Sequence, residues 1–74
     1  MPKYESIHYT WHSVKQMRAR RITDRDVERA LEFGDGRPGK HGKWLYEFGN
    51  IRVVIVEEVR TARIITVIRL RGRQ

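Results

Sequence analysis

The chain has 74 residues, with 16 lysines and arginines, 9 acidic residues and a formal net charge of +7. This length suits one small domain over residues 1–74 and excludes a multidomain enzyme. Because the sequence contains no cysteine, neither a disulfide nor a thiolate metal site can stabilise the fold. The excess of positive charge indicates an anionic partner such as RNA, DNA or an acidic protein.

The hydropathy pattern does not favour a membrane protein. The longest aliphatic run, residues 53–56, is far shorter than the roughly 18–20 apolar residues of a membrane span. The first residues are mixed and polar, without the apolar core of a secretory signal. We therefore expect a cytoplasmic protein with no membrane partner.

Two helices are predicted in the first half of the chain. Thr10 is a typical N-cap residue before a run of helix-forming residues that should end near Arg21. Thr23 precedes Asp26 by three residues, the spacing of a capping box, and apolar residues follow with helical periodicity. Gly34 should end the second helix in the left-handed conformation. We expect the two helices to form a helical hairpin.

Strands are predicted in the second half. Residues 34–42 contain four glycines and a proline and are expected to be a loop. Residues 44–48 and 51–56 alternate in polarity around a Gly-Asn turn, and residues 63–70 are rich in β-branched side chains. The prediction is an α+β fold with a helical hairpin packed on a three-stranded antiparallel meander. Residues 4–9 are compatible with an additional short edge strand.

Several side chains are candidates for the hydrophobic core. Trp44, Tyr46 and Phe48 share one face of a strand, where they would either fill the core or stack on RNA bases. The core interpretation is favoured, with Trp11 as a packing partner. The other predicted core residues are Val27, Leu31, Val53, Ile55 and Ile65. The opposite side of the strand over 51–56 is only half polar and suits an active site, a partner-binding face or a dimer interface.

The first helix carries a polar stripe. His12, Gln16 and Arg20 are spaced by four residues and therefore lie on one side of the helix. Cleaving RNA without metal requires an acid, a base and cations that stabilise the charged phosphorane, and His12 and Arg20 are suited to such roles. The alternative is that His12 bonds the backbone near the helix start and Arg20 is a surface cation. His8 and His12 are not expected to bind a metal, because Thr10 interrupts the helix between them and no third ligand is nearby.

The basic residues are concentrated in three stretches: the predicted helical hairpin, the glycine-rich loop and the end of the chain. Guanidinium groups match the geometry of phosphate oxygens, so these stretches are candidates for nucleic-acid binding. The alternative is a solvated surface with pairing inside the chain. The candidate nucleic-acid-binding residues are Arg18, Arg21, Lys40, His41 and Lys43.

The order of residues resembles a known family. Residues 9–34 read Y-T-x-H-S-x-x-Q-M-x-x-R-x-I-T-x-x-D-V-x-x-A-L-x-x-G, and residues 65–69 read I-T-V-I-R. This resembles a small bacterial domain family of unknown function, with the pattern S-x-H-A-x-x-R-M-x-x-R-x-I-[ST]-x-x-D-V and the ending I-T-V-Y-R. That family looks related to BrnT-type toxins within the RelE/ParE-like ribonuclease fold. Gln16 and Ile68 stand where its pattern has arginine and tyrosine.

The resemblance implies a toxin-like, RNA-binding domain of a toxin-antitoxin system that is a candidate metal-independent endoribonuclease and needs no cofactor. In that role His12 is the acid or base, while Arg20 and Arg69 stabilise phosphate charge. An acidic antitoxin is the implied protein partner. The alternative is a non-catalytic module for protein interaction or homodimerisation.

Overall fold

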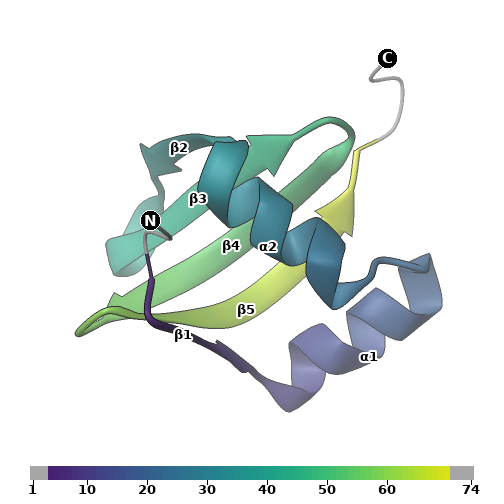
Figure 1. Cartoon of the computed structure of the whole chain (residues 1–74), viewed down its shortest axis with the longest axis horizontal. Helices are drawn as coiled ribbons and strands as arrows, with labels where there is room; N and C mark the ends of the chain where they lie inside the picture. The colour runs from purple at the N-terminus through teal and green to yellow at the C-terminus, as the bar shows by residue number, and fades with distance from the viewer. Residues whose placement is uncertain (1–3, 71–74) are drawn as a thin grey trace.

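The computed structural model describes residues 4–70. In this part of the chain five strands form one mixed sheet in the order β1-β5-β4-β3-β2, and two α-helices pack against it (Figure 1). The elements are β1 (Ser6–Tyr9), α1 (Trp11–Arg20), α2 (Asp24–Phe33), β2 (Asp35–Pro38), the 3-10 turn η1 (Lys40–Gly42), β3 (Lys43–Phe48), β4 (Ile51–Glu58) and β5 (Thr61–Arg69). None of the helices in the described part is long and apolar enough to cross a membrane.

The helix caps act as the sequence predicts. The Thr10 side chain accepts a hydrogen bond from the backbone N–H of Ser13 at 3.2 Å, and α1 begins there. Thr23 and Asp26 form both hydrogen bonds of a capping box at the start of α2. Each bond satisfies a backbone or cap group that the helix itself leaves unpaired. The α+β class and both predicted helices are therefore confirmed.

The first helix ends near Arg21 as predicted, but the conformation of Gly34 and the packing of the two helices differ from the prediction. Arg21, with φ of 57°, takes the left-handed position after α1, whereas Gly34 is extended, with φ of −77°. The helices pack mainly on the sheet, α1 against β5 and α2 against β3 and β4, rather than on each other as a hairpin. The sheet face provides the apolar surface that each helix covers.

The sheet has five strands instead of a three-stranded meander. The expected edge strand is present as β1, which pairs in parallel with β5. The expected loop over 34–42 contains β2, an edge strand antiparallel to β3. A Cβ atom at Gly36 would lie 2.6 Å from the Tyr46 ring, so this glycine allows close packing instead of breaking the strand. Pro38 ends β2 at the sheet edge, where proline is tolerated.

The core lies between the helices and the sheet. Val27, Leu31, Val53 and Ile55 are buried as predicted, but Ile65 is only half-buried. The register explains this difference, because Ile55 pairs with Ile64 and Val54 with Thr66, which leaves Ile65 as the extra residue of a bulge. The complete buried apolar set is Tyr4, Met17, Ile22, Val27, Ala30, Leu31, Tyr46, Ile51, Val53, Ile55, Ala62, Ile64 and Val67.

The aromatic row on β3 is divided between core and surface. Tyr46 is 2% exposed and Trp44 packs against the edge of the core, whereas Phe48 is 40% exposed. Trp11 is 75% exposed at the start of α1, so the prediction that it packs on this row is wrong. Its position follows from the cap at Thr10, which begins α1 with Trp11 outside the buried face.

Candidate nucleic-acid interface

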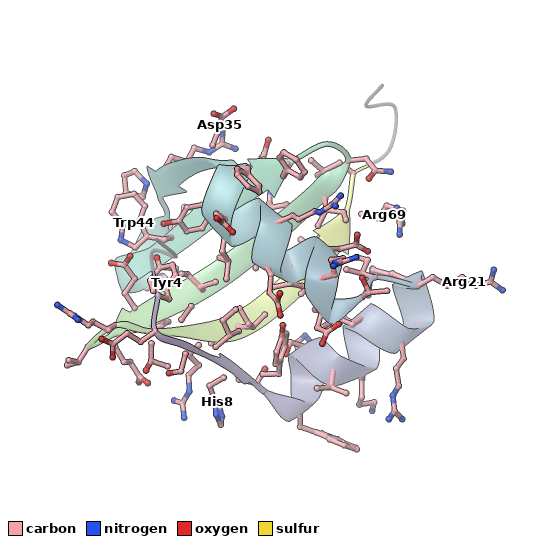
Figure 2. The ribbon with its side chains drawn as sticks, viewed as in Figure 1. Tyr4, His8, Arg21, Asp35, Trp44 and Arg69 are labelled. Carbon is pink, nitrogen blue, oxygen red and sulfur yellow. The ribbon has the colours of Figure 1, made fainter. Side chains whose placement is uncertain are left out.

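The C-terminal end of α1 and the end of β5 enclose a basic pocket. It has a volume of about 330 Å³ and is lined by Ala19, Arg20, Arg21 and Arg69. Arg20 is the last residue of α1, Arg21 follows it in the left-handed position, and Arg69 is the last residue of β5. Figure 2 shows Arg21 and Arg69 on one side of the molecule and Tyr4 and Trp44 on the other.

Arg69 connects the two elements of this pocket. Its guanidinium donates hydrogen bonds to the backbone carbonyls of Arg20 at 3.0 Å and Arg21 at 3.4 Å. It also donates to the side-chain oxygen of Asn50 at 3.4 Å. A cation at a helix C-terminus is favourable because it offsets the partial negative charge of the last carbonyls. Arg69 therefore has a structural role and adds positive charge to the pocket.

The arginines at the end of α1 are not neutralised by carboxylates. Arg18, Arg20 and Arg21 are exposed, and none of them forms an ion pair within residues 4–70. Other arginines of the described chain do form ion pairs: Arg37 and Arg52 with Glu47, Arg60 with Glu5 and Arg63 with Glu58. The end of α1 is therefore a concentration of uncompensated positive charge.

The structure brings together only two of the three predicted catalytic residues. Arg20 and Arg69 share the pocket, whereas His12 is exposed in the first turn of α1. With a rise of 1.5 Å per residue, His12 lies about 12 Å from Arg20 along the helix axis. At that separation, one phosphate can contact both His12 and Arg20 only if the two side chains extend toward each other along the helix surface.

The predicted nucleic-acid-binding residues occupy two ends of the sheet. Arg18 and Arg21 lie at the end of α1, where Arg21 lines the basic pocket and Arg18 faces a different pocket, next to Asp24. Lys40 and His41 are in η1, and Lys43 begins β3 at the end opposite to Phe48. A strand of this length spans about 17 Å, so the two groups do not form one continuous contact surface.

A second pocket lies between α1 and the start of α2. It has a volume of about 470 Å³ and is lined by Tyr9, Val14, Met17, Arg18, Ile22 and Asp24. The Tyr9 hydroxyl is buried and has no hydrogen-bond partner within residues 4–70. Burial, followed by the charges of Glu28 and Asp24, raises the pKa of Tyr9 to about 12. Sequence reasoning did not predict this pocket, because residues on three separate elements form it.

The described residues contain no cluster of three or more metal-ligating side chains of the His, Cys, Asp and Glu types.

Comparison with solved structures supports the fold. The chain is similar to one chain in the crystal structure of the toxin-antitoxin complex RelBE2 from Mycobacterium tuberculosis, with a TM-score of 0.72 and 20% identity, covering 93% of both chains. At this identity the similarity establishes the fold alone. A family model described as a domain of unknown function, DUF4258, matches residues 9–69, and the chain belongs to this family. No curated protein matches the sequence.

Proposed function

We propose that the chain is a toxin-like domain of a toxin-antitoxin system and that it binds RNA through the pocket at the end of α1. The fold shared with a chain of a toxin-antitoxin complex supports the class of protein. The same likeness supports a protein partner, and the net charge of +7 favours an acidic one as the antitoxin.

The observation that carries RNA binding is the set of arginines without carboxylate partners. Arg20 and Arg21 line the pocket together with Arg69, and Arg18 lies in the same last turn of α1, where it lines the second pocket. A guanidinium can donate two parallel hydrogen bonds to phosphate oxygens, and binding of several phosphates releases condensed counterions. Binding a phosphate is more favourable for an arginine without a carboxylate partner than for one that already forms an ion pair.

Binding is better supported than cleavage. The distance of about 12 Å along α1 separates the acid-base candidate His12 from the cations of the pocket. Metal-independent cleavage with His12 as acid or base and Arg20 and Arg69 as phosphate-stabilising cations stays a prediction. Contacts of Lys40, His41 and Lys43 with RNA also stay a prediction, at the other end of β3.

The proposal is tested by removing charge at the pocket and at a matched distant site. Arg20→Ala with Arg21→Ala removes two charges from the pocket. Arg60→Gln with Arg63→Gln removes two charges near the β4–β5 turn, where both residues form exposed ion pairs of little energetic value. We expect only the pocket variant to lose affinity for single-stranded RNA. Equal losses in both variants would contradict a phosphate site at the end of α1.

A second candidate function is protein interaction or homodimerisation, which the uncovered face of the sheet favours. Opposite the helices, apolar side chains from three neighbouring strands remain half-buried. They are Leu45, Val54, Val56, Ile65 and Ile68. A lysine at Val54 would introduce a charge at the centre of this face. A dimer of the wild-type chain in sedimentation, lost in Val54→Lys with the fold retained, would support this candidate.

A further inference from the structure

Two phenylalanines remain exposed on the helix-covered side of the molecule. Phe33, the last residue of α2, is 64% exposed and Phe48, the last residue of β3, is 40% exposed. Their ring centroids are 6.3 Å apart and the rings are tilted by 40°. The pair therefore forms an aromatic surface that the core does not use.

The sheet register places this aromatic pair near the basic pocket. Phe48 pairs with Ile51, and Ile51 pairs with Arg69. Phe48 and Arg69 are thus two strands apart in one row, a backbone separation of about 10 Å. Phe48 is on the same face as the buried Tyr46, two residues earlier, and Arg69 on the same face as the buried Val67. Both side chains consequently lie on the face of the sheet that carries the helices.

Further polar groups lie between or beside the aromatic pair and the basic pocket. Asn50, in the turn after Phe48, accepts the hydrogen bond from Arg69. Arg29 precedes Phe33 by one helical turn on α2, is exposed and forms no ion pair in the part of the chain that the structure describes. Two arginines, Arg29 on α2 and Arg69 on β5, therefore lie on either side of the aromatic pair.

We propose that Phe33 and Phe48 form a stacking site for a base of single-stranded RNA, next to the phosphate contacts of the arginine pocket. This inference rests on the proposed RNA binding and names the substrate class. Stacked nucleotides advance about 3.4 Å each, so a short strand reaches from the pocket to the aromatic pair. A base in a duplex is already stacked and paired, and its face cannot reach the rings. The combination of exposed aromatic rings and a basic groove is typical of single-strand recognition.

The test uses leucine substitutions, which keep an apolar side chain but remove the aromatic face. The probe is a short, end-labelled single-stranded oligoadenylate, measured by fluorescence anisotropy, with the same strand annealed to oligouridylate as the duplex control. Trp11→Leu is the matched control, because Trp11 is also an exposed aromatic residue but lies at the start of α1. Thermal melting of each variant confirms that it is folded.

We expect Phe33→Leu with Phe48→Leu to weaken single-strand binding about 5- to 150-fold, the range that corresponds to loss of one stacked base. The salt dependence should stay unchanged, because no phosphate contact is lost, and Trp11→Leu should bind like the wild type. An unchanged affinity of the folded leucine variant would overturn the stacking site while the proposed RNA binding stands. Absence of single-strand binding by the wild type at low salt would overturn both. Equal weakening of duplex binding would overturn the assignment to single strands.

Discussion

The side-chain oxygen of Gln16 accepts a hydrogen bond from the backbone N–H of Val67 at 2.9 Å. β1 pairs with β5 only as far as Tyr9 and Ile64, so the next part of this β5 edge has no neighbouring strand within the described chain. α1 lies along that edge, and the Gln16 amide supplies an acceptor that a strand would otherwise provide. Gln16 is therefore a structural residue of the fold, although its spacing from His12 and Arg20 suggested a place in a polar surface stripe.

We expect Gln16→Ala to lower the free energy of unfolding by about 1–3 kcal/mol, the cost of leaving a partly buried N–H unpaired. Gln16→Arg should also destabilise, because a guanidinium cannot accept a hydrogen bond. Urea denaturation measures the effect. Lys15→Ala is the control, since Lys15 is exposed on the same turn. Equal stability of Gln16→Ala and Lys15→Ala would show that the Val67 contact contributes nothing.

Leu31 anchors α2 to the sheet and is 3% exposed. Leu31→Ala should lower the free energy of unfolding by about 2–5 kcal/mol through lost burial and the cavity that remains. In a domain of this size such a loss is a large part of the total stability. Glu32→Ala, at the exposed neighbouring position, should change little. A thermal melt of Leu31→Ala that overlays the wild type would contradict the packing of α2 described above.

Two tyrosines should make the fold sensitive to alkaline pH. The pKa of Tyr9 is raised to about 12 by burial and then by the charges of Glu28 and Asp24. Burial also raises the pKa of Tyr4, as do its hydrogen bonds with Glu57 and Tyr46. Above about pH 10 the unfolded chain loses tyrosine protons that the folded chain retains, so stability should fall as pH rises from there. Below that pH the contribution of these protons is fully present.

Tyr9→Phe isolates one part of this effect. Because the Tyr9 hydroxyl is buried without a hydrogen-bond partner in the described chain, its removal should not destabilise the fold at neutral pH. Stability should then fall less steeply between about pH 10 and pH 12 than in the wild type. Denaturation midpoints measured across this range give both results. Parallel pH profiles for the two proteins would contradict the raised pKa of Tyr9.

His12 distinguishes binding from catalysis. It is exposed and lies at the opposite end of α1 from the pocket, so His12→Ala should leave both the melting temperature and the RNA affinity unchanged. A general acid or base contributes about 10²–10⁴ in rate, and its loss appears in cleavage rather than in binding or stability. Incubation of RNA with each protein in EDTA, followed by gel analysis, provides the comparison. Cleavage by the wild type that disappears in His12→Ala would establish His12 as the acid-base group and contradict a purely binding role.

The sequence predicted local features well and non-local ones poorly. Thr10 and Thr23 cap helices through contacts with residues three positions away, and such contacts can be read from spacing. Gly36 was predicted to lie in a loop. Glycine is needed there because the Tyr46 ring, on another strand, leaves no room for a Cβ atom, and the sequence does not show this contact. Ile65 was misplaced because a bulge in the β4–β5 pairing shifts the alternation of faces.

In the candidate site, too, local features were predictable from the sequence and contacts between distant residues were not. The concentration of arginine near the end of α1 was visible in the sequence, and Arg69 was selected through a family resemblance. Their meeting was not predictable, because Arg69 is 49 residues from its partner Arg20. The aromatic pair of Phe33 and Phe48 likewise depends on the sheet register and on where α2 ends.

The salt dependence of RNA binding tests the central claim most directly. Each phosphate contacted on a single strand contributes a slope of about −0.7 to the log of the binding constant against the log of the salt concentration. With Arg18, Arg20 and Arg21 as contacts, we predict a slope of about −2 for the wild type and a clearly flatter one for Arg20→Ala with Arg21→Ala. An affinity independent of salt, or the same slope in wild type and variant, would contradict phosphate binding at the end of α1.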